Sequence, residues 1–152
     1  MGWWLVKTEP DVYSIDDLAR DTSTLWTGVR NYQARNFLRQ MKRGERVLVY
    51  HSNAEPSGVV GVATVRRESA PDPTQFDRSS EYFDPKATEE SPRWFCPDLK
   101  FSKKFPAMVS LDALRKSKVL EGLLLLQRGS RLSVIPVSER HFEAIVTLGS
   151  KG

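Results

Sequence analysis

The chain has 152 residues, of which 39% are hydrophobic and 28% charged, and its formal net charge is +4. This composition predicts one compact domain over residues 1–152, and no apolar run has the ~20 residues of a membrane-spanning helix. The lone cysteine, Cys96, excludes an intramolecular disulfide and a cysteine-based zinc cluster, and we expect a buried thiol without a catalytic role.

The N-terminal segment is expected to form a strand, a short helix and a loop. Residues 3–7 are strand formers. Ser14 and Asp17 have the spacing of a capping box, which predicts a helix over residues 15–20. Residues 21–24 are then expected to be a polar loop. No basic leader or cleavage site precedes the strand, so we expect a cytoplasmic protein.

A second helix is expected to begin after Asn31, a residue type that caps helix N-termini well. Apolar side chains recur with helical spacing at residues 34, 37, 38 and 41, which predicts one face turned toward the core. Gly44 is the expected C-terminal stop. A basic stripe should run beside the apolar face, and it consists of Arg35, Arg39 and Lys42.

The middle of the chain predicts a hairpin followed by a long irregular segment. Residues 46–51 and 59–65 are rich in β-branched and aromatic side chains, and residues 53–58 between them suit a hairpin loop. From residue 68 to residue 92 the composition shifts to Pro, Asp, Ser and Glu, which is typical of a functional or mobile loop.

The last third predicts two strands and two helices. Residues 93–105 are strand-like but interrupted by Pro97, and residues 110–125 are expected to be helical. Residues 132–137 form another expected strand, and a closing helix follows over residues 139–148. Strands with short helices between and after them indicate an α+β domain built on a curved sheet or small barrel.

Charge is distributed unevenly along the chain. Residues 26–67 contain eight basic and two acidic residues, whereas residues 68–98 contain three basic and eight acidic residues. Residues 99–152 are again basic. If the two basic segments meet in space, they form a face that attracts polyanions such as nucleic acid. The alternative is an ordinary solvated surface.

The motifs of several enzyme classes are missing from the sequence. Neither glycine-rich phosphate-binding motif occurs, and there is no Gly-x-Ser-x-Gly elbow. The two histidines, His51 and His141, have no spacing suitable for a metal. We therefore expect no metal site, no cofactor and no catalytic residue. If the protein were an enzyme acting on a nucleobase, Glu9 and His51 would be the one candidate acid–base pair.

Four short stretches place aromatic and hydrogen-bonding residues at the ends of expected elements, where pockets form on a rigid scaffold. They are residues 7–10, 26–31, 50–53 and 130–134. The second stretch offers free helix N-terminal N–H groups to an anion or a carbonyl. The third suits the edge of a planar heterocycle, and in the fourth Arg131 and Ser133 should share one face of a strand.

Each stretch also has a simpler interpretation. Lys7 and Glu9 could be a surface ion pair, Trp26 a core residue, the third stretch a hydrogen-bonded turn and the fourth ordinary sheet surface. If the four converge, they form an aromatic wall with a polar rim. An extruded base is held in this way, with stacking worth ~1–3 kcal/mol and edge hydrogen bonds deciding its identity. The basic residues expected nearby for phosphates are Arg30, Arg35, Arg39 and Lys42.

Six segments of the chain closely resemble the EVE domain family, and the match extends over nearly the whole sequence. They include WLVKTEP at residues 4–10, WTGVRNYQARN at residues 26–36 and YHSN at residues 50–53, with further matches at residues 58–63, 82–86 and 131–134. Length and motif order resemble bacterial single-domain members. The resemblance implies a PUA-like fold, a small and strongly curved β-barrel with helices packed around it, related to the YTH readers of methylated adenosine.

The resemblance also implies a reader function, because EVE relatives are associated with modified cytosines in DNA or with modified RNA. It implies that the base pocket is lined by Trp26, Val29, Asn31, His51, Ser52 and Asn53. The rim would be completed by Lys7, Glu9, Tyr82 and Arg131. Arg30 and Ser133, from the same stretches, complete the expected ligand-binding set.

The sequence therefore predicts a non-catalytic, monomeric reader that holds a modified cytosine in DNA or a modified base in RNA, without a membrane partner. A sensor or interaction module that binds a small anionic or heterocyclic ligand in the same pocket is the alternative. Salt-sensitive binding would favour the reader, because phosphate contacts release counterions.

Overall fold

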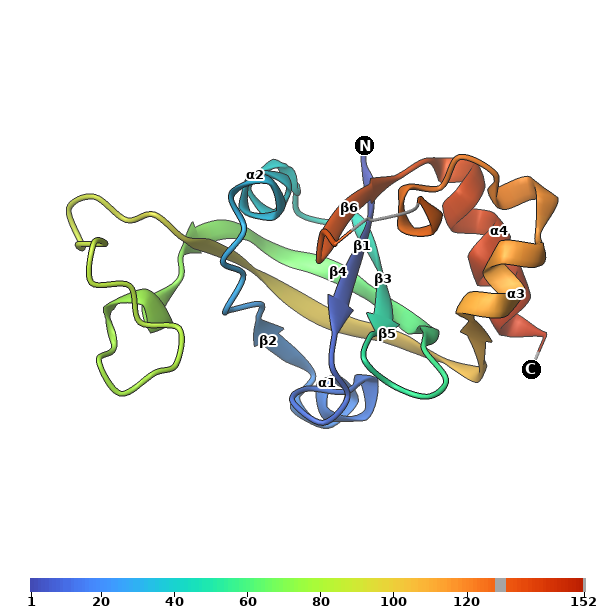
Figure 1. Cartoon of the computed structure of the whole chain (residues 1–152), viewed down its shortest axis with the longest axis horizontal. Helices are drawn as coiled ribbons and strands as arrows, with labels where there is room; N and C mark the ends of the chain where they lie inside the picture. Colours follow the sequence, from blue (N-terminus) through green and yellow to red (C-terminus); the bar gives the residue numbers. More distant parts are fainter. Residues whose placement is uncertain (128–130, 152) are drawn as a thin grey trace.

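The computed structural model describes residues 1–127 and 131–151 (Figure 1). Its strands are β1 (Trp3–Thr8), β2 (Ser23–Leu25), β3 (Arg46–His51), β4 (Gly58–Pro71), β5 (Phe95–Ser110) and β6 (Val134–Val137). Its α-helices are α1 (Ile15–Asp21), α2 (Tyr32–Gln40), α3 (Leu111–Lys116) and α4 (Glu139–Ser150). Short 3₁₀ turns are η1 (Pro73–Phe76), η2 (Lys118–Leu120) and η3 (Leu124–Leu126).

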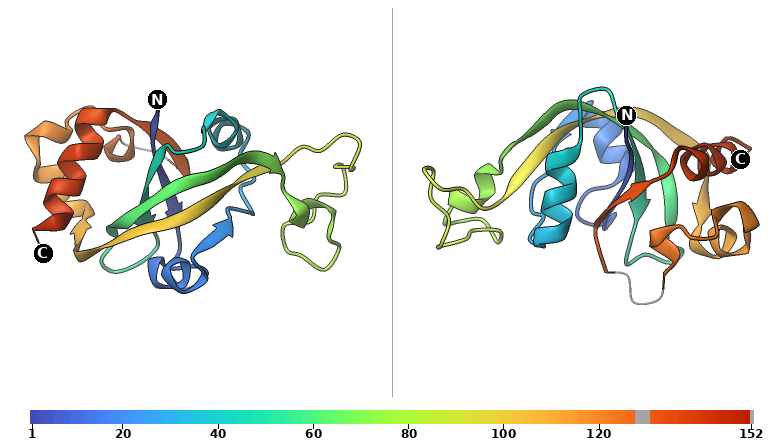
Figure 2. Two further views of the ribbon diagram at one scale, coloured as in Figure 1. Left: turned by 180° about the vertical axis from the view of Figure 1, so that it is seen from behind. Right: turned by 90° about the horizontal axis from the view of Figure 1, so that it is seen from above.

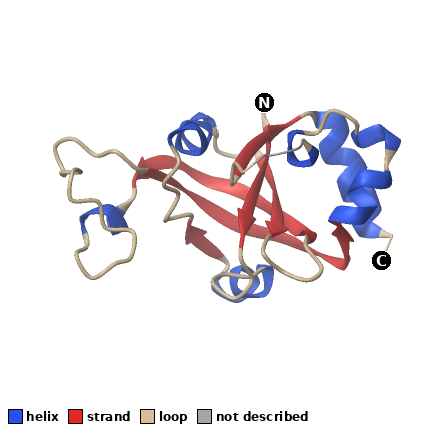
Figure 3. Cartoon of the chain, in the orientation of Figure 1, coloured by secondary structure: helices blue, strands red, loops and turns tan. Residues whose placement is uncertain are grey.

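The six strands form one curved sheet in the order β2-β5-β4-β3-β1-β6 (Figure 3). Strands β1 and β3 are parallel, and every other neighbouring pair is antiparallel. In the part of the chain that the structure describes, the edge strands β2 and β6 do not pair with each other. The expected mixture of helices with a curved sheet is thus confirmed, whereas the expected closure into a barrel is not observed, because two edges stay open.

The curvature of the sheet comes from the long β4–β5 ribbon. Its pairing register shifts at four places, among them between Val59 and Gly61 and between Arg67 and Ala70. Such bulges insert unpaired residues, bend the strand and increase its twist. Seen from above, the ribbon arches over the other elements, and its far end carries the long loop between β4 and β5 (Figure 2).

Apolar side chains pack on both faces of the sheet because successive residues of a strand point in opposite directions. In β1, Trp4 and Val6 join a core cluster with residues of α1 and α2. Leu5, between them, joins a second cluster with Leu114 of α3 and Phe142 of α4. Helices therefore cover both faces, which leaves the ends of the strands for a site.

The helix starts follow the expected capping chemistry. The Ser14 side chain accepts the N–H of Asp17, and the Asp17 carboxylate accepts the N–H of Ser14, so the capping box of α1 is confirmed. Asn31 accepts the N–H of Ala34 at 2.9 Å and caps α2. Among the described residues, no helix has the length and apolar character that a membrane crossing requires.

Four expectations for local structure were wrong. Helix α2 ends at Gln40 and Met41 is extended, so Gly44 is not the C-terminal stop of this helix. Residues 23 and 24, expected in a loop over residues 21–24, belong to the edge strand β2, which is too short to show a period in the sequence. Pro97 does not interrupt β5, because it lies opposite the register shift between Arg67 and Ala70, where no ladder N–H is needed. Residues 110–125 form α3 and two 3₁₀ turns instead of one helix, since the backbone is extended at Ser117 and Gly122 has a φ of 89°.

Candidate functional site

A pocket of about 800 Å³ lies where β1, β2, the β3–β4 turn, the segment before α2 and the long loop meet. Of the twelve residues expected to bind a ligand, eleven line it: Lys7, Glu9, Trp26, Val29, Arg30, Asn31, Ser52, Asn53, Tyr82, Arg131 and Ser133. The four stretches thus converge in space. Ser130, in the fourth stretch, lies outside the described residues.

Strand pairing brings three of these stretches together. The parallel register aligns Thr8 of β1 with His51 of β3, so the residues that follow each strand emerge at the same end of the sheet. The N–H of Ser52 donates to the carbonyl of Thr8 at 3.0 Å. On the other side of β1, the N–H of Lys7 donates to the carbonyl of Ser133 at 2.8 Å. The polar rim is therefore fixed by backbone hydrogen bonds.

Two side chains of the rim are linked directly. Asn53 Nδ2 donates to Glu9 Oε1 at 2.7 Å, so Glu9 pairs with an amide and not with Lys7 as in the surface ion pair considered above. Asn53 has a φ of 49°, in the left-handed region that Asn tolerates better than most residues. The second carboxylate oxygen of Glu9 and the amide oxygen of Asn53 remain as acceptors on the rim.

Trp26 is both a core residue and a pocket wall. Only 7% of it is exposed, and it belongs to the cluster under α1 and α2, yet it lines the pocket. Its backbone N–H donates to the carbonyl of Pro97, and the Tyr13 ring meets the indole edge-on at a centroid distance of 6.2 Å. The two interpretations of Trp26 are compatible, and the indole is a rigid wall.

The turn before α2 is closed against the long loop. Gly28 has a φ of 86°, and a Cβ there would lie 2.8 Å from the Tyr82 ring, so both the backbone conformation and the space require glycine. The Gly28 N–H donates to Asp72 Oδ2 at 2.8 Å. Asp72, which follows β4, is fully buried and also accepts from the backbone and the hydroxyl of Thr74.

Arg30 makes hydrogen bonds within the protein, and the phosphate contact expected for it stays a prediction. Its guanidinium donates to Asp72 at 3.2 Å, to the Thr74 hydroxyl at 2.9 Å and to the Tyr82 carbonyl at 2.7 Å. With these partners inside the protein, Arg30 ties the segment before α2 to the long loop. Sequence reasoning missed Asp72, although an Asp before Pro73 is a typical start of a helical turn.

His51 is the one expected pocket residue that the structure places elsewhere. It is 8% exposed, and its Nε2 accepts the N–H of Ile15 at the start of α1. Burial lowers the pKa of His51, with opposing effects from Asp16, which raises it, and Lys104, which lowers it. Because a strand alternates its faces, His51 belongs under α1, and the Glu9–His51 acid–base pair does not face one cavity.

Burial perturbs other groups of the pocket in the direction expected for a partly desolvated site. It lowers the pKa of Lys7, whose ammonium lies 6.0 Å from the Tyr50 ring centroid. It also raises the pKa of Tyr82.

Outside the pocket, Cys96 is buried as expected. Burial raises the pKa of its thiol to about 12, so the thiol is protonated at neutral pH. No group of three or more metal-ligating side chains occurs within the described ranges.

The expected basic stripe runs along α2 toward the long loop. Arg35 donates to the carbonyl of Arg93 at 2.8 Å, and the Arg39 guanidinium lies 4.2 Å from the Phe95 ring centroid. Lys42 is 3.8 Å from Glu68, and both side chains are exposed. Phosphate contacts by Arg35, Arg39 and Lys42 stay a prediction. Sequence reasoning also missed four residues of the wall: Val12, Tyr13, Thr24 and Leu25.

Comparison with known proteins places the chain in a family. The EVE domain matches residues 2–148. Human thymocyte nuclear protein 1 is 35% identical over 167 aligned positions, which cover 97% of this chain and 74% of the human protein. A crystal structure of a Pseudomonas syringae protein is 44% identical with a TM-score of 0.94, covering 97% of this chain and 99% of that one.

A second solved structure carries a ligand. It is human thymocyte nuclear protein 1 in complex with DNA that contains 5-methylcytosine, with 34% identity, a TM-score of 0.92 and coverage of 100% of this chain and 99% of that one. The family match spans nearly the whole chain, and the two solved structures are similar to it in sequence and share its fold. The chain belongs to the EVE domain family.

Proposed function

We propose that this protein is a non-catalytic reader of nucleic acid that accommodates a modified base in the pocket described above. The first candidate for this base is 5-methylcytosine in DNA. The carrying observation is the complex of the human relative with 5-methylcytosine DNA, since that protein superimposes on this chain with a TM-score of 0.92. The convergence of four distant stretches on one pocket of about 800 Å³ supports the same reading.

The pocket residues match the chemistry of a cytosine. Cytosine presents an N4 amino donor beside the N3 and O2 acceptors. Glu9 offers a carboxylate acceptor and Lys7 an ammonium donor on the same rim. Trp26 provides a flat wall, and Val29 with Leu25 provides apolar surface for a 5-methyl group. Hydrogen bonds to the edge of the base would decide which base is bound, and stacking on the aromatic wall would provide affinity.

Three observations support a reader rather than an enzyme. His51 is buried against α1, Glu9 is hydrogen-bonded to Asn53, and the raised pKa of Cys96 disfavours the nucleophilic thiolate. A general acid–base pair must lie within hydrogen-bond reach of the reacting atoms. The candidate pair Glu9 and His51 is not so placed, because His51 is directed toward α1 and only Glu9 lines the pocket. The open curved sheet with helices on both faces supports a PUA-like fold in an unclosed form.

Fluorescence anisotropy with matched oligonucleotides tests the proposal. Labelled DNA of one sequence would carry cytosine or 5-methylcytosine at a single position, and an RNA version would be run alongside. We expect tighter binding of the methylated DNA and a loss of affinity between 50 and 200 mM salt, because phosphate contacts release counterions. Equal affinity for both DNAs contradicts the proposal. Salt-independent binding of a free nucleoside as tight as that of the oligonucleotide supports the small-molecule alternative.

A further inference from the structure

An exposed aromatic ring lies beside the pocket, at the first residue of α2. Tyr32 is 47% exposed and directly follows the pocket residue Asn31. One face of its ring is stacked on Trp94, with a centroid separation of 4.8 Å and an interplanar angle of 21°. Tyr32 therefore stays accessible although Trp94 lies against one face of its ring.

The ring is held in place before any ligand arrives. Trp94 Nε1 donates to Asp84 Oδ2 at 2.7 Å, and Gln75 makes hydrogen bonds with both the N–H and the carbonyl of Trp94. The Tyr32 hydroxyl accepts a hydrogen bond from Arg93. A surface aromatic fixed in this way binds a planar ligand with less loss of side-chain freedom than a mobile one.

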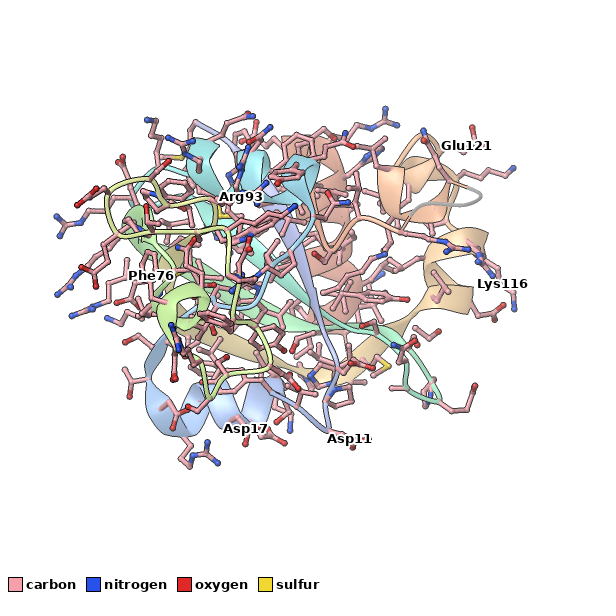
Figure 4. The ribbon with its side chains drawn as sticks, turned by 60° about the vertical axis from the view of Figure 1, so that its left-hand side comes forward. Asp11, Asp17, Phe76, Arg93, Lys116 and Glu121 are labelled. Atoms are coloured by element: carbon pink, nitrogen blue, oxygen red, sulfur yellow. The ribbon has the colours of Figure 1, made fainter. Side chains whose placement is uncertain are left out.

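Guanidinium groups surround the ring. The Arg35 guanidinium carbon lies 4.8 Å from the Tyr32 centroid and that of Arg93 lies 5.7 Å from it. Figure 4 shows Arg93 on the returning part of the long loop, beside α2. Asp84 lies 3.7 Å from Arg93 and partly offsets its charge, whereas Arg35 has no ion-pair partner within the described ranges. An aromatic face with flanking arginines is the combination that binds a stacked base and its phosphates.

The ring is contiguous with the pocket. The Arg30 guanidinium lies 5.5 Å from the centroid of Tyr82, a pocket wall, and 5.3 Å from the centroid of Trp94, which supports Tyr32. The partly buried Arg30 therefore packs against both the Tyr82 ring and the Trp94 ring. A strand that places one base in the pocket can carry its neighbouring nucleotide past this ring.

We infer that Tyr32 is a second stacking site, which binds the base next to the pocket-bound base on the same strand, with Arg35 and Arg93 beside the phosphate between them. This inference rests on the proposed function and adds to it the nucleotide neighbouring the modified base. The expected ligand is a nucleic-acid strand, because the Tyr32 ring is flat, exposed and flanked by cations.

A double-mutant cycle between protein and DNA tests the inference. The probe is a short single-stranded DNA with one central 5-methylcytosine, either intact or with an abasic site at the 5′ or 3′ neighbour. We expect Tyr32→Ala to weaken binding of the intact DNA on the order of tenfold. One abasic site should weaken binding to the unmodified protein by the same factor and have no further effect on the variant. Tyr32→Phe, which keeps the ring, should recover most of the affinity.

Val119→Ala is the matched control, since Val119 is 42% exposed on η2, outside the pocket lining. It should bind as the unmodified protein does, and thermal denaturation checks that each variant is folded. A folded Tyr32→Ala variant that binds within twofold of the unmodified protein overturns the inference, and so do additive losses in the cycle. If the unmodified protein instead fails to prefer 5-methylcytosine over cytosine, the proposed function itself has failed.

Discussion

The carboxylate of Asp72 and the backbone N–H of Gly28 are joined by a 2.8 Å hydrogen bond across 44 residues of sequence. Asp72 is fully buried and also pairs with Arg30 at 3.2 Å. This contact fixes the turn that forms one wall of the pocket to the start of the long loop. The shape of the pocket therefore depends on a carboxylate that does not line it.

Replacing Asp72 should destabilise the protein and loosen the pocket together. Asp72→Asn leaves the guanidinium of Arg30 without its carboxylate in a largely buried place, where breaking an ion pair costs roughly 3 kcal/mol. Urea denaturation measures this loss. Asp112→Asn is the matched control, because the Asp112–Lys116 pair is exposed and should contribute little. Similar denaturation midpoints for the two variants would contradict the buried role of Asp72.

Two glycines separate backbone strain from crowding at the pocket. Gly28 and Gly44 have φ values of 86° and 90°, but a Cβ at Gly44 would have no neighbour within 4 Å, whereas one at Gly28 would meet the Tyr82 ring. Gly44→Ala should cost ~1 kcal/mol of stability from strain alone. Gly28→Ala should lower the free energy of unfolding by more than this, as measured by denaturation. It should also weaken DNA binding, as measured by anisotropy. Equal effects on stability and on binding would show that the Tyr82 contact is unimportant.

Asn53→Gly should separate binding from stability. Glycine adopts the left-handed φ of 49° without strain, so we expect the free energy of unfolding to change by less than ~0.5 kcal/mol. The variant loses the amide that holds Glu9, and its affinity for 5-methylcytosine DNA should fall. Denaturation and anisotropy on the same preparation check both halves. Unchanged affinity would show that Asn53 and its hydrogen bond to Glu9 do not contribute to DNA recognition.

The buried His51 should make the protein less stable in mild acid. Burial lowers its folded pKa below the ordinary value of 6.5, so the unfolded chain binds the proton more readily. The stabilisation from neutral His51 is therefore present above pH 6.5 and is lost as the pH falls through the lower folded pKa. His51→Gln should flatten the decline in stability between pH 7 and pH 5, measured by urea denaturation at each pH. A decline as steep as that of the unmodified protein would contradict this assignment.

Much of the fold follows from local sequence. The capping residues Ser14 and Asn31 predicted the starts of α1 and α2, and the two apolar runs around residues 53–58 predicted the β3–β4 hairpin. These signals depend on only a few neighbouring residues, so they can be recognised in the sequence without knowledge of the fold. The same holds for the four stretches, because each lies at the end of its own strand or helix.

The rest depends on contacts between distant residues. The bulge opposite Pro97 belongs to a partner strand, and the short edge strand β2 exists because β5 pairs with it. The inward orientations of His51 and Arg30 follow from packing against α1 and the long loop. The sequence around Asp72 indicates only a turn, and its support of the pocket becomes visible only in the fold.

Two-dimensional ¹H–¹⁵N NMR with 5-methylcytosine DNA tests most directly whether the base enters this pocket. We expect the indole N–H of Trp26 and the side-chain amides of Asn31 and Asn53 to shift on titration, while the indole of Trp3, outside the pocket lining, stays unchanged. Cytosine DNA of the same sequence should give smaller shifts at these groups. Shifts confined to other surfaces, with Trp26 and Asn53 unmoved at saturation, would contradict the account.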